Sequence, residues 1–273
     1  MKKNKIFIIG GSGFIGNAIY KELCHYFDTY GTYCSNNSYE SNGQYLKYDM
    51  HQDSIFEILE KVRPDIIISA LRGDFSAQIQ AHIHIMEYLS KHSCKLYFLS
   101  SANVFDAYSK YPSYELDKTL SESIYGKLKI RIENMMLRMP EQQIVILRIP
   151  MIFGNFSPRI KEMKVLLNDN EPIEVFPKLI VNVTTEDRLT QQIHYLINRN
   201  KKGIFHLGSF DLTHHEDFIK EVIKRIGNYH PIYKRVFTTN DDRYLAVLSK
   251  YNKLPKHLKF SVQEVIDHHI TVE

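Results

Sequence analysis

A tyrosine and a lysine four residues apart, Tyr125 and Lys129, are suited by type and spacing to proton transfer. Residues four apart in a helix lie on the same face. A phenol normally titrates near pH ~10, and a neighbouring ammonium lowers its pKa by favouring the phenolate. Such a pair can exchange a proton nearer neutral pH, as general acid–base catalysis requires. The alternative is an ordinary amphipathic helix surface, where the same spacing is common.

A glycine-rich turn early in the chain is suited to binding the pyrophosphate of a dinucleotide. Gly10, Gly13 and Gly16 follow four apolar residues, 6–9, that read as a buried strand, and a helical pattern begins near Phe14. We expect Gly10 to permit the tight turn, Gly13 to admit the phosphates, and Gly16 to let the helix pack on the strand. The expected cofactor contacts of this turn are Gly10, Ser12, Gly13, Phe14, Ile15 and Gly16. An ordinary glycine-rich loop is the alternative.

Strands and helices are expected to alternate through the first 150 residues. The predicted strands are 6–9, 29–35, 45–49, 65–71, 95–101 and 144–149, and the predicted helices are 14–27, 54–62, 75–92 and 123–138. Strict alternation favours right-handed crossovers and a doubly wound parallel sheet, which is the α/β Rossmann fold. In the helix at 75–92 we expect Ile79, Ile83, Met86 and Leu89 to face inward, with His82 and His84 partly buried on its flank.

The ends of three predicted strands should approach the cofactor, because ligands bind at the carboxyl ends of parallel strands. Ser35 ends the second strand and Asn36 follows it, at the place where many NAD-binding proteins carry a carboxylate for the ribose; its absence here favours NADP, although no Arg is present to hold a 2′-phosphate. Asp49 ends the third strand and Met50 follows it, and Asp49 either lies beside the adenine or caps the next helix. Ala70 and Leu71 end the fourth strand.

The remainder of the chain is expected to form a small lobe. The predicted nucleotide-binding domain covers residues 1–153, with 182–208 returning to it, and 154–181 and 209–273 form a small α+β substrate-binding lobe. The predicted helices of the region are 160–167, 185–198, 215–227 and 262–268, and residues 203–208 are the strand that returns to the sheet.

Composition indicates which kinds of partner the protein is expected to lack. The formal net charge is +4 and the basic residues are dispersed, so we expect no nucleic-acid partner and no membrane surface. Three scattered cysteines are typical of a reduced, cytoplasmic protein, and no metal-binding spacing occurs. A homodimer is a candidate assembly.

Several motifs, in chain order, resemble those of the extended short-chain dehydrogenase/reductases, and in pattern the dTDP-4-dehydrorhamnose reductase-like branch of the NAD-dependent epimerase/dehydratases. The matching segments are 10–16, Pro64-Asp65, 100–106, 112–117, 125–129 with Glu133, and 147–154. The resemblance covers nearly the whole chain. Departures from the family pattern fall at Met151, at Ala70-Leu71-Arg72 and at His82, and they leave the identity of the sugar open.

The resemblance implies roles for individual residues. Tyr125 would donate the proton, Lys129 would bind the nicotinamide ribose and tune Tyr125, and Ser101 would hold the substrate carbonyl, with Ser100 structural. The cofactor would also contact Tyr125 and Lys129, and the expected substrate-binding residues are Arg72, Asn103, Phe105 and Met151. Asp106 would lie in the loop that borders the sugar.

The expected function is reduction of a nucleotide-linked 4-keto-sugar with NADP or NAD. Two alternatives remain open from the sequence. One is an epimerase or dehydratase that retains NAD and needs a further acid or base, for which Asp106, Glu115 and Asp117 are the nearby candidates. The other is a non-catalytic regulatory subunit that binds NADP.

Overall fold

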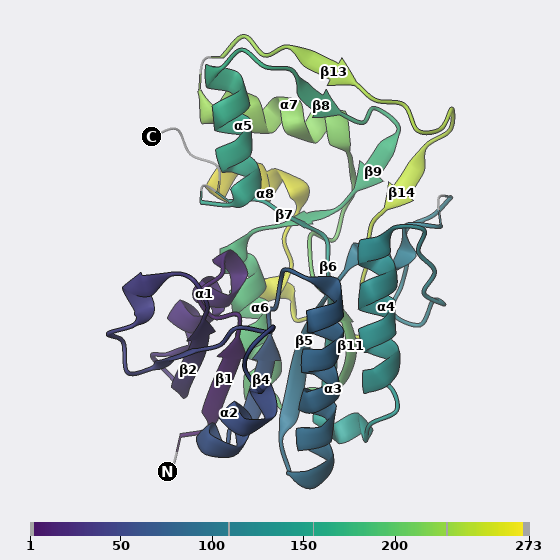
Figure 1. Ribbon diagram of the computed structural model, residues 1–273. Coiled ribbons are helices and arrows are strands. Elements are labelled where there is room, and N and C mark those ends of the chain that lie inside the picture. Colours follow the sequence, from purple (N-terminus) through teal and green to yellow (C-terminus); the bar gives the residue numbers. More distant parts are fainter. Residues whose placement is uncertain (1–2, 109, 155, 228, 270–273) are drawn as a thin grey trace. The chain divides into compact units, whose positions relative to one another are not determined.

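A seven-stranded parallel sheet is the main feature of the computed structural model, which describes residues 3–108, 110–154, 156–227 and 229–269 (Figure 1). The strand order is β11-β6-β5-β4-β1-β2-β3. The strands are β1 (Lys5–Ile9), β2 (Asp28–Tyr33), β3 (Tyr45–Lys47), β4 (Ile66–Ser69), β5 (Lys95–Ser101), β6 (Ile144–Ile149) and β11 (Gly203–His206). From β1 the chain winds first toward β3 and then, from β4, the other way. The predicted α/β doubly wound fold is therefore confirmed.

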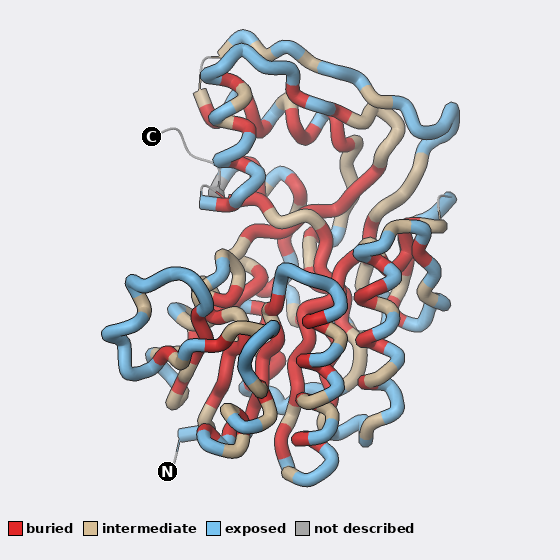
Figure 2. Tube along the Cα trace, in the orientation of Figure 1, coloured by how far each residue is buried: buried red, intermediate tan, exposed pale blue. Residues whose placement is uncertain are grey.

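Three helices pack side by side on one face of this sheet, as Figure 1 shows: α2 (Ile55–Val62), α3 (Phe75–Lys91) and α4 (Ile124–Met136). Their apolar faces and the central strands form one buried core, the strands of which run red through the interior in Figure 2. The core strands are apolar on both faces, and such burial is what allows a parallel sheet to form. α1 (Phe14–Leu23) follows β1 directly.

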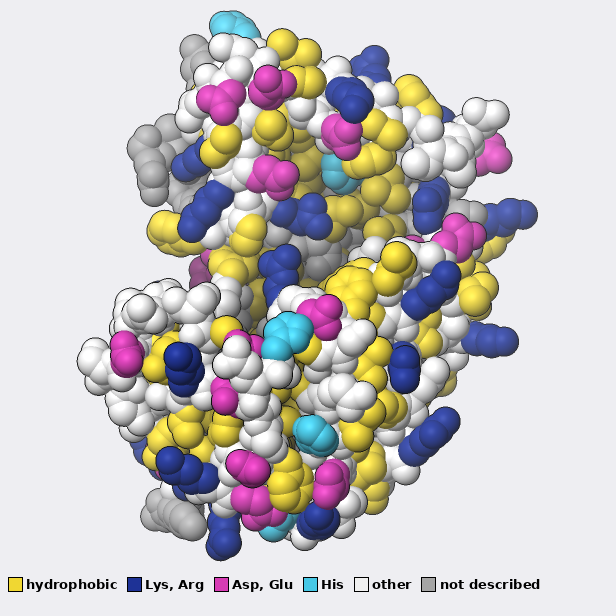
Figure 3. Space-filling view, in the orientation of Figure 1, with side chains coloured by type: hydrophobic (Ala, Val, Ile, Leu, Met, Phe, Trp, Pro, Cys, Tyr) yellow, Lys and Arg dark blue, Asp and Glu magenta, His cyan; other side chains and the backbone are white. Residues whose placement is uncertain are grey.

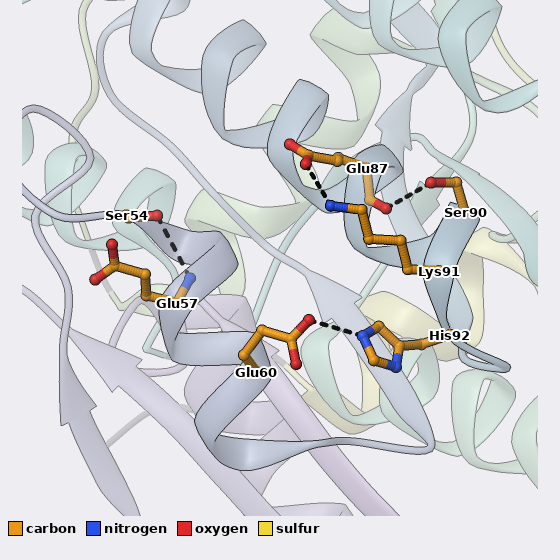
Figure 4. A network of polar contacts seen from close by, with 7 residues as sticks. All are labelled: Ser54, Glu57, Glu60, Glu87, Ser90, Lys91 and His92. Carbon is orange, nitrogen blue, oxygen red and sulfur yellow. Dashed lines mark hydrogen bonds and ion pairs between the residues drawn. The ribbon is translucent and has the colours of Figure 1, made fainter.

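Polar contacts join α2 to α3 at the edge of this layer (Figure 4). The carboxylate of Glu60 lies 2.7 Å from Nε2 of His92, just beyond the end of α3. Ser54 caps the start of α2 by accepting a hydrogen bond from the Glu57 N–H. This assigns the cap to Ser54, so the alternative that Asp49 caps this helix is wrong.

The buried face of α3 differs from the predicted one. Leu89 is buried as expected, but Ile83 is 40% exposed, and Ile79 and Met86 only border the core. The inward face instead carries Ala81, His82, Ile85 and Tyr88. His82 was expected to be partly buried and is completely buried, because the true face is rotated from the predicted apolar stripe by about one residue.

The termini of several elements also shift. α1 ends at Leu23 rather than near Phe27, because the N–H groups of Tyr26 and Phe27 both bond to the Leu23 carbonyl and close a turn. β2 and β4 end two residues earlier than predicted, at Tyr33 and Ser69. The predicted bounds of β5 and β6 are the observed ones.

By its contacts the chain divides into two units. The first contains Met1–Ser100, Ile124–Leu147 and Ile193–Phe205, and the second contains Ser101–Ser123, Arg148–Gln192 and His206–Glu273.

The second unit contains short strands that the sequence pattern did not reveal. They form three small sheets: β7 (Met151–Ile152) with β10 (Val183–Thr184); β9 (Leu179–Val181) between β12 (Thr213–His214) and β14 (Arg243–Leu245); and β8 (Ile173–Val175) with β13 (Tyr233–Arg235). The helices are α5 (Pro158–Asn168), α7 (His215–Ile226) and α8 (Val262–His269), and α6 (Glu186–Asn198) runs from this unit into the first. Strands of two or three residues are too short to show a periodic pattern.

Acidic and basic side chains are interspersed over the face drawn in Figure 3. Within the described residues, no helix is both long and apolar enough to cross a membrane. Nor do three or more His, Cys, Asp or Glu side chains gather among those residues in a group that could hold a metal ion.

Candidate functional site

The glycine turn after β1 is tied to the neighbouring strands. Gly10 has a positive φ of 85°, and its N–H donates to Oγ1 of Thr32 at 2.8 Å. A Cβ at Gly10 would lie 2.7 Å from the Ala70 carbonyl oxygen. The turn therefore needs glycine both for its conformation and for its close approach to the end of β4. Ser12 adds a backbone hydrogen bond to Thr32.

Gly13 and Gly16 are glycines for different reasons. A Cβ at Gly16 would lie 2.1 Å from the Gly10 carbonyl oxygen, so helix α1 could not pack against the turn. A Cβ at Gly13 would meet only the Gly10 carbonyl oxygen, at 3.3 Å, and Gly13 is exposed. Packing within the protein thus requires Gly16 more strictly than Gly13. A ligand that needs the space above the turn would account for Gly13.

The start of α1 is suited to an anion. No side chain caps this helix and its first turn carries no acidic residue. Phe14 and Ile15 occupy that turn and are half-buried. Unsatisfied N–H groups and the positive end of the helix dipole favour a phosphate here. The residues present therefore fit the pyrophosphate of a dinucleotide.

The other expected cofactor contacts follow the strands of the first unit. Ser35 and Asn36 are exposed just beyond β2. Beyond β3, the Asp49 carboxylate accepts from the His51 N–H at 2.9 Å, and Met50 lies against Gly73. Three more residues follow β4: Ala70 touches the glycine turn, Leu71 is buried, and Arg72 is exposed.

Lys129 is buried in the first unit, and its ammonium has defined neighbours. Nζ donates to the Leu99 carbonyl oxygen at 3.0 Å and lies 4.7 Å from the centroid of the Phe98 ring. Burial lowers the pKa of Lys129 to about 8, although the Glu133 carboxylate opposes the change. The group is therefore still mostly protonated at neutral pH.

Tyr125 lies on the same face of α4 as Lys129. Nζ of Lys129 is 5.6 Å from the centroid of the Tyr125 ring, and the Phe75 ring packs on that tyrosine with centroids 6.3 Å apart. Tyr125 is 40% exposed, whereas its neighbour Lys129 is only 5% exposed. The predicted pairing of these two residues on one helix face is present.

Ser100 and Glu133 form a buried pair behind Lys129. The Ser100 hydroxyl donates to the Glu133 carboxylate, and Glu133 is 1% exposed. Ser100 therefore has a structural role, because its hydroxyl is used in a hydrogen bond inside the first unit.

A buried histidine beside this group, His82, was noted in the sequence as a departure from the family pattern but was not predicted as a site residue. His82 Nδ1 lies 2.6 Å from the Gln78 carbonyl oxygen, which can only accept, so Nδ1 carries the proton. Nε2, 2.9 Å from the Ser69 hydroxyl, then accepts from it. Burial, together with the nearby Lys129 ammonium, lowers the pKa of His82 to about 4. Its ring meets Phe98 edge-on at 5.1 Å.

Ser101 belongs to the second unit, whereas Tyr125 and Lys129 belong to the first. The Ser101 hydroxyl donates to Oδ1 of Asn103 at 2.9 Å and accepts from the Asn103 N–H at 3.2 Å. It thereby caps the short helix η2 (Ala102–Phe105). This hydroxyl is well oriented, and it must exchange its bond to Asn103 if it is to donate to a substrate.

Asp106 organises the segment ahead of α4. Its carboxylate accepts from the Glu122 N–H at 2.6 Å and from the Ser123 hydroxyl. Burial alone would raise the pKa of Asp106, but these hydrogen bonds outweigh it and the pKa is lowered. Its carbonyl oxygen accepts from Arg243.

Phe105 packs against a buried arginine. The Arg148 guanidinium lies 4.8 Å from the centroid of the Phe105 ring and donates to the Glu115 carbonyl oxygen at 3.1 Å. Arg148 also approaches Nε2 of His206 at 3.4 Å. This cluster fixes the loop that carries Asn103 and Phe105. Met151, in β7, packs on the core of the second unit.

The Glu115 carboxylate is held by a second loop. It accepts hydrogen bonds from the backbone N–H groups of Lys250, Tyr251 and Asn252 and from the Ser249 hydroxyl. Burial alone would raise the pKa of Glu115, but the backbone donors outweigh it and the pKa is lowered. The Glu115 carboxylate is thus engaged in structural hydrogen bonds.

A doubly wound sheet with a glycine turn after its first strand and a Tyr–Lys pair on the helix after its fifth defines a dinucleotide-binding protein of the short-chain dehydrogenase/reductase type. The family comparison agrees with that class. The chain belongs to the RmlD substrate binding domain family, whose model matches residues 4–252. The resemblance stated from the sequence is therefore confirmed. No match was found among curated proteins.

Solved structures of sugar-nucleotide enzymes share the fold. The dTDP-4-dehydrorhamnose reductase of Bacillus anthracis, in complex with NADP, is 20% identical, with 98% of this chain and 99% of that chain covered and a TM-score of 0.78. A hypothetical dTDP-4-dehydrorhamnose reductase of Sulfolobus tokodaii is also 20% identical, with 89% and 91% covered and a TM-score of 0.76. The dTDP-glucose 4,6-dehydratase of B. anthracis, in complex with NAD, is 14% identical, with 98% and 95% covered and a TM-score of 0.79.

Proposed function

We propose that the protein is an NAD(P)-dependent oxidoreductase that reduces a nucleotide-linked 4-keto-sugar, as dTDP-4-dehydrorhamnose reductases do. The observation that carries the proposal is the accessible Tyr125 beside the buried ammonium of Lys129, in a chain of this family. The similar B. anthracis reductase was crystallised with NADP, which supports the cofactor class.

The proposed division of labour follows the chain. Residues 1–153, together with 182–208, would hold the cofactor, with the pyrophosphate on the glycine turn. Residues 154–181 and 209–273 would form the lobe that binds the sugar nucleotide. Arg72, Asn103, Phe105 and Met151 would border the sugar.

When bound, NAD(P)H supplies a hydride from C4 of its nicotinamide to the sugar carbonyl carbon. Tyr125 Oη would donate the proton to the carbonyl oxygen and regain one from solvent, which reaches this 40% exposed side chain. Lys129, charged at neutral pH, favours the resulting phenolate and would hold the nicotinamide ribose. The Ser101 hydroxyl would turn from Asn103 to the carbonyl oxygen and orient it.

The acids near Ser101 favour a reductase over an epimerase or dehydratase. The carboxylates of Asp106 and Glu115 each accept several hydrogen bonds within the second unit. Asp117 accepts from the Tyr114 N–H at 2.7 Å. An additional catalytic acid or base would have to give up such contacts, whereas a reductase needs no further acid.

Substitution of Tyr125 by Phe tests this function. The change removes one hydroxyl from an exposed side chain, so we expect an unaltered thermal midpoint and a loss of reductase turnover of roughly 10²-fold or more. The matched control is Tyr26→Phe, at another exposed tyrosine of the first unit, which should keep full turnover. Wild-type rates in Tyr125→Phe would disprove the assignment. Dinucleotide binding without turnover by the wild type, on a panel of keto-sugar nucleotides, would favour a regulatory subunit.

The proposed assembly is a cytoplasmic homodimer. Apolar side chains of α3 and α4 are exposed, among them Ile83 at 40% and Ile124 at 73%, and these would gain from burial. Native mass spectrometry of the fresh protein would report the assembly and any retained cofactor together. Retained NAD would favour an epimerase or dehydratase.

A further inference from the structure

A cavity of about 740 Å³ lies in the second unit, beside helix α7 and strand β13. Such a volume is typical of sites for small molecules, which span about 300–1,000 Å³. The described residues that line the cavity include none of those proposed above to hold the cofactor or the sugar. They come from α7, from the segment that follows this helix and from β13, and among them are Lys220, Ile223, Lys224, Tyr229, Pro231 and Tyr233.

Three hydrogen-bond donors lie together in this cavity. Lys220 and Lys224 are four residues apart on α7 and therefore share one face of the helix. Nζ of Lys220 lies 5.6 Å from the centroid of the Tyr233 ring. Burial raises the pKa of Tyr233 and the charges of both lysines oppose the rise, which indicates that the phenol lies close to both ammonium groups. Two ammonium groups and a phenol hydroxyl are suited to bind an anion.

The ion pairs of the two lysines leave them able to contact a ligand. The Lys224 side chain is 70% exposed and pairs with Glu221 at 2.5 Å, and such surface pairs contribute little to stability. Exchange of the Glu221 carboxylate for a ligand anion therefore costs little. Lys220 pairs with Glu216 at 2.6 Å. Glu216 also pairs with Arg235 at 2.8 Å, so it keeps a cationic partner when Lys220 turns to a ligand.

The rest of the lining is apolar and aromatic. Ile223 is buried, and Tyr229 and Pro231 are half-buried. The Tyr229 ring folds back over the end of α7, where a Cβ at Gly227 would lie 2.9 Å from its Cε2 atom. The ring can take this place because Gly227 has no side chain. A wall of this kind favours a flat apolar body, from which a free phosphate ion would gain nothing.

We propose that the cavity is a second ligand site, which binds an aromatic compound that carries a phosphate group. The phosphate would contact Lys220, Lys224 and the Tyr233 hydroxyl, and the aromatic body would pack against Tyr229 and Pro231. Mononucleotides belong to this chemical class. The proposal does not depend on the reductase function, because no residue of the proposed reaction takes part in it.

Fluorescence can report on this cavity alone, because the chain contains no tryptophan. Ile232→Trp introduces one at an exposed position between Pro231 and Tyr233. The probe is 4-nitrophenyl phosphate, whose nitro-aromatic ring quenches indole fluorescence, and we expect saturable quenching. Inorganic phosphate, as a competitor, and 4-nitrophenol, as a quencher, should each bind roughly tenfold more weakly, because each lacks one half of the ligand.

Lys224→Met in the same reporter protein removes one ammonium group and should weaken binding of the probe at least about tenfold. Lys91→Met is the matched control, because Lys91 is also an exposed lysine paired within its own helix, with Glu87, and its loss should leave the affinity unchanged. Tyr229→Trp serves as a second reporter if Ile232→Trp does not fold.

Several results would overturn the proposal. One is the absence of saturable quenching in both reporter proteins, and another is unchanged affinity in Lys224→Met. An equal loss in Lys224→Met and Lys91→Met would assign the effect to net charge. Binding of 4-nitrophenol or of inorganic phosphate as tight as that of the ester would refute the chemical class of the ligand. Each of these results leaves the reductase proposal standing.

Discussion

Lys129 donates a hydrogen bond from its buried ammonium to the backbone carbonyl oxygen of Leu99, the third-last residue of β5. The bond ties helix α4 to β5, the strand that ends at Ser101. One proton of the ammonium is thereby used inside the protein.

Reductase activity should decline as the pH rises through about 8. Burial lowers the pKa of Lys129 from its ordinary value to about 8, so the ammonium loses its charge there, and with it the stabilisation of the Tyr125 phenolate. This decline is the alkaline limb of the kcat–pH profile, which measures it. The effect on stability has the opposite sign. Lys129 keeps its proton to higher pH in the unfolded chain than in the folded one, so this group raises the free energy of unfolding as the pH rises above ~8. A profile that stays flat to pH ~10 would contradict the assignment.

Glu133→Gln should move that limb to lower pH. The Glu133 carboxylate raises the pKa of Lys129, so its removal leaves burial and the Arg72 charge less opposed. Ser100→Ala is the control, because it removes the hydrogen bond to Glu133 but keeps the carboxylate. The limb should then stay near its wild-type position. A limb that does not move in Glu133→Gln would show that the two charges are not coupled in catalysis.

His82 should make the fold sensitive to acid. Its pKa is lowered by burial to about 4, so between that value and the ordinary 6.5 the unfolded chain binds a proton that the folded chain does not. Stability therefore decreases as the pH is lowered across this window, by roughly 3 kcal/mol in total. Urea unfolding at pH 7 and pH 4.5 should show a smaller loss for His82→Gln than for the wild type. The control His25→Gln, at an exposed histidine, should lose as much stability at pH 4.5 as the wild type does. If His82→Gln also loses as much as the wild type, His82 is not the acid-sensitive group.

Two glycine substitutions should separate binding from stability. Gly16→Ala places a Cβ on the Gly10 carbonyl oxygen and should cost about 1–3 kcal/mol, seen as a lowered thermal midpoint. Gly13→Ala meets a single atom at 3.3 Å and should change the midpoint little, yet weaken dinucleotide binding in titration calorimetry. Unchanged affinity in Gly13→Ala would show that no phosphate approaches this residue.

The sheet could be predicted because its strands are buried on both faces. β5 and β6 each contain a run of four apolar residues, 96–99 and 144–147, and the bounds of both strands agree with the prediction. α3 shows where the apolar pattern fails to predict the buried face of a helix. A stripe of large apolar residues suggested the wrong face, because small Ala81 and polar His82 pack inward where the strands lie close.

The site could be predicted in part. The Tyr125–Lys129 pair follows from helical spacing, and their neighbour Glu133 lies one further turn along α4. The partners of His82 come from β4 and from the preceding turn of α3, and only tertiary structure brings Ser69 to its ring. The cavity beside α7 depends on the fold of the segments that line it, which the residue types alone did not specify.

The alternation of the two units along the chain has a consequence for how such proteins can diversify. Each unit is assembled from three segments, so the chain passes between them five times, and β11 reaches the sheet only after two of the three segments of the second unit have been traversed. A single recombination event cannot exchange one unit for that of a relative, and a fragment that stops before β11 leaves β6 as an unpaired, aggregation-prone edge. New specificities in this architecture must arise by substitutions in place rather than by transfer of a cassette.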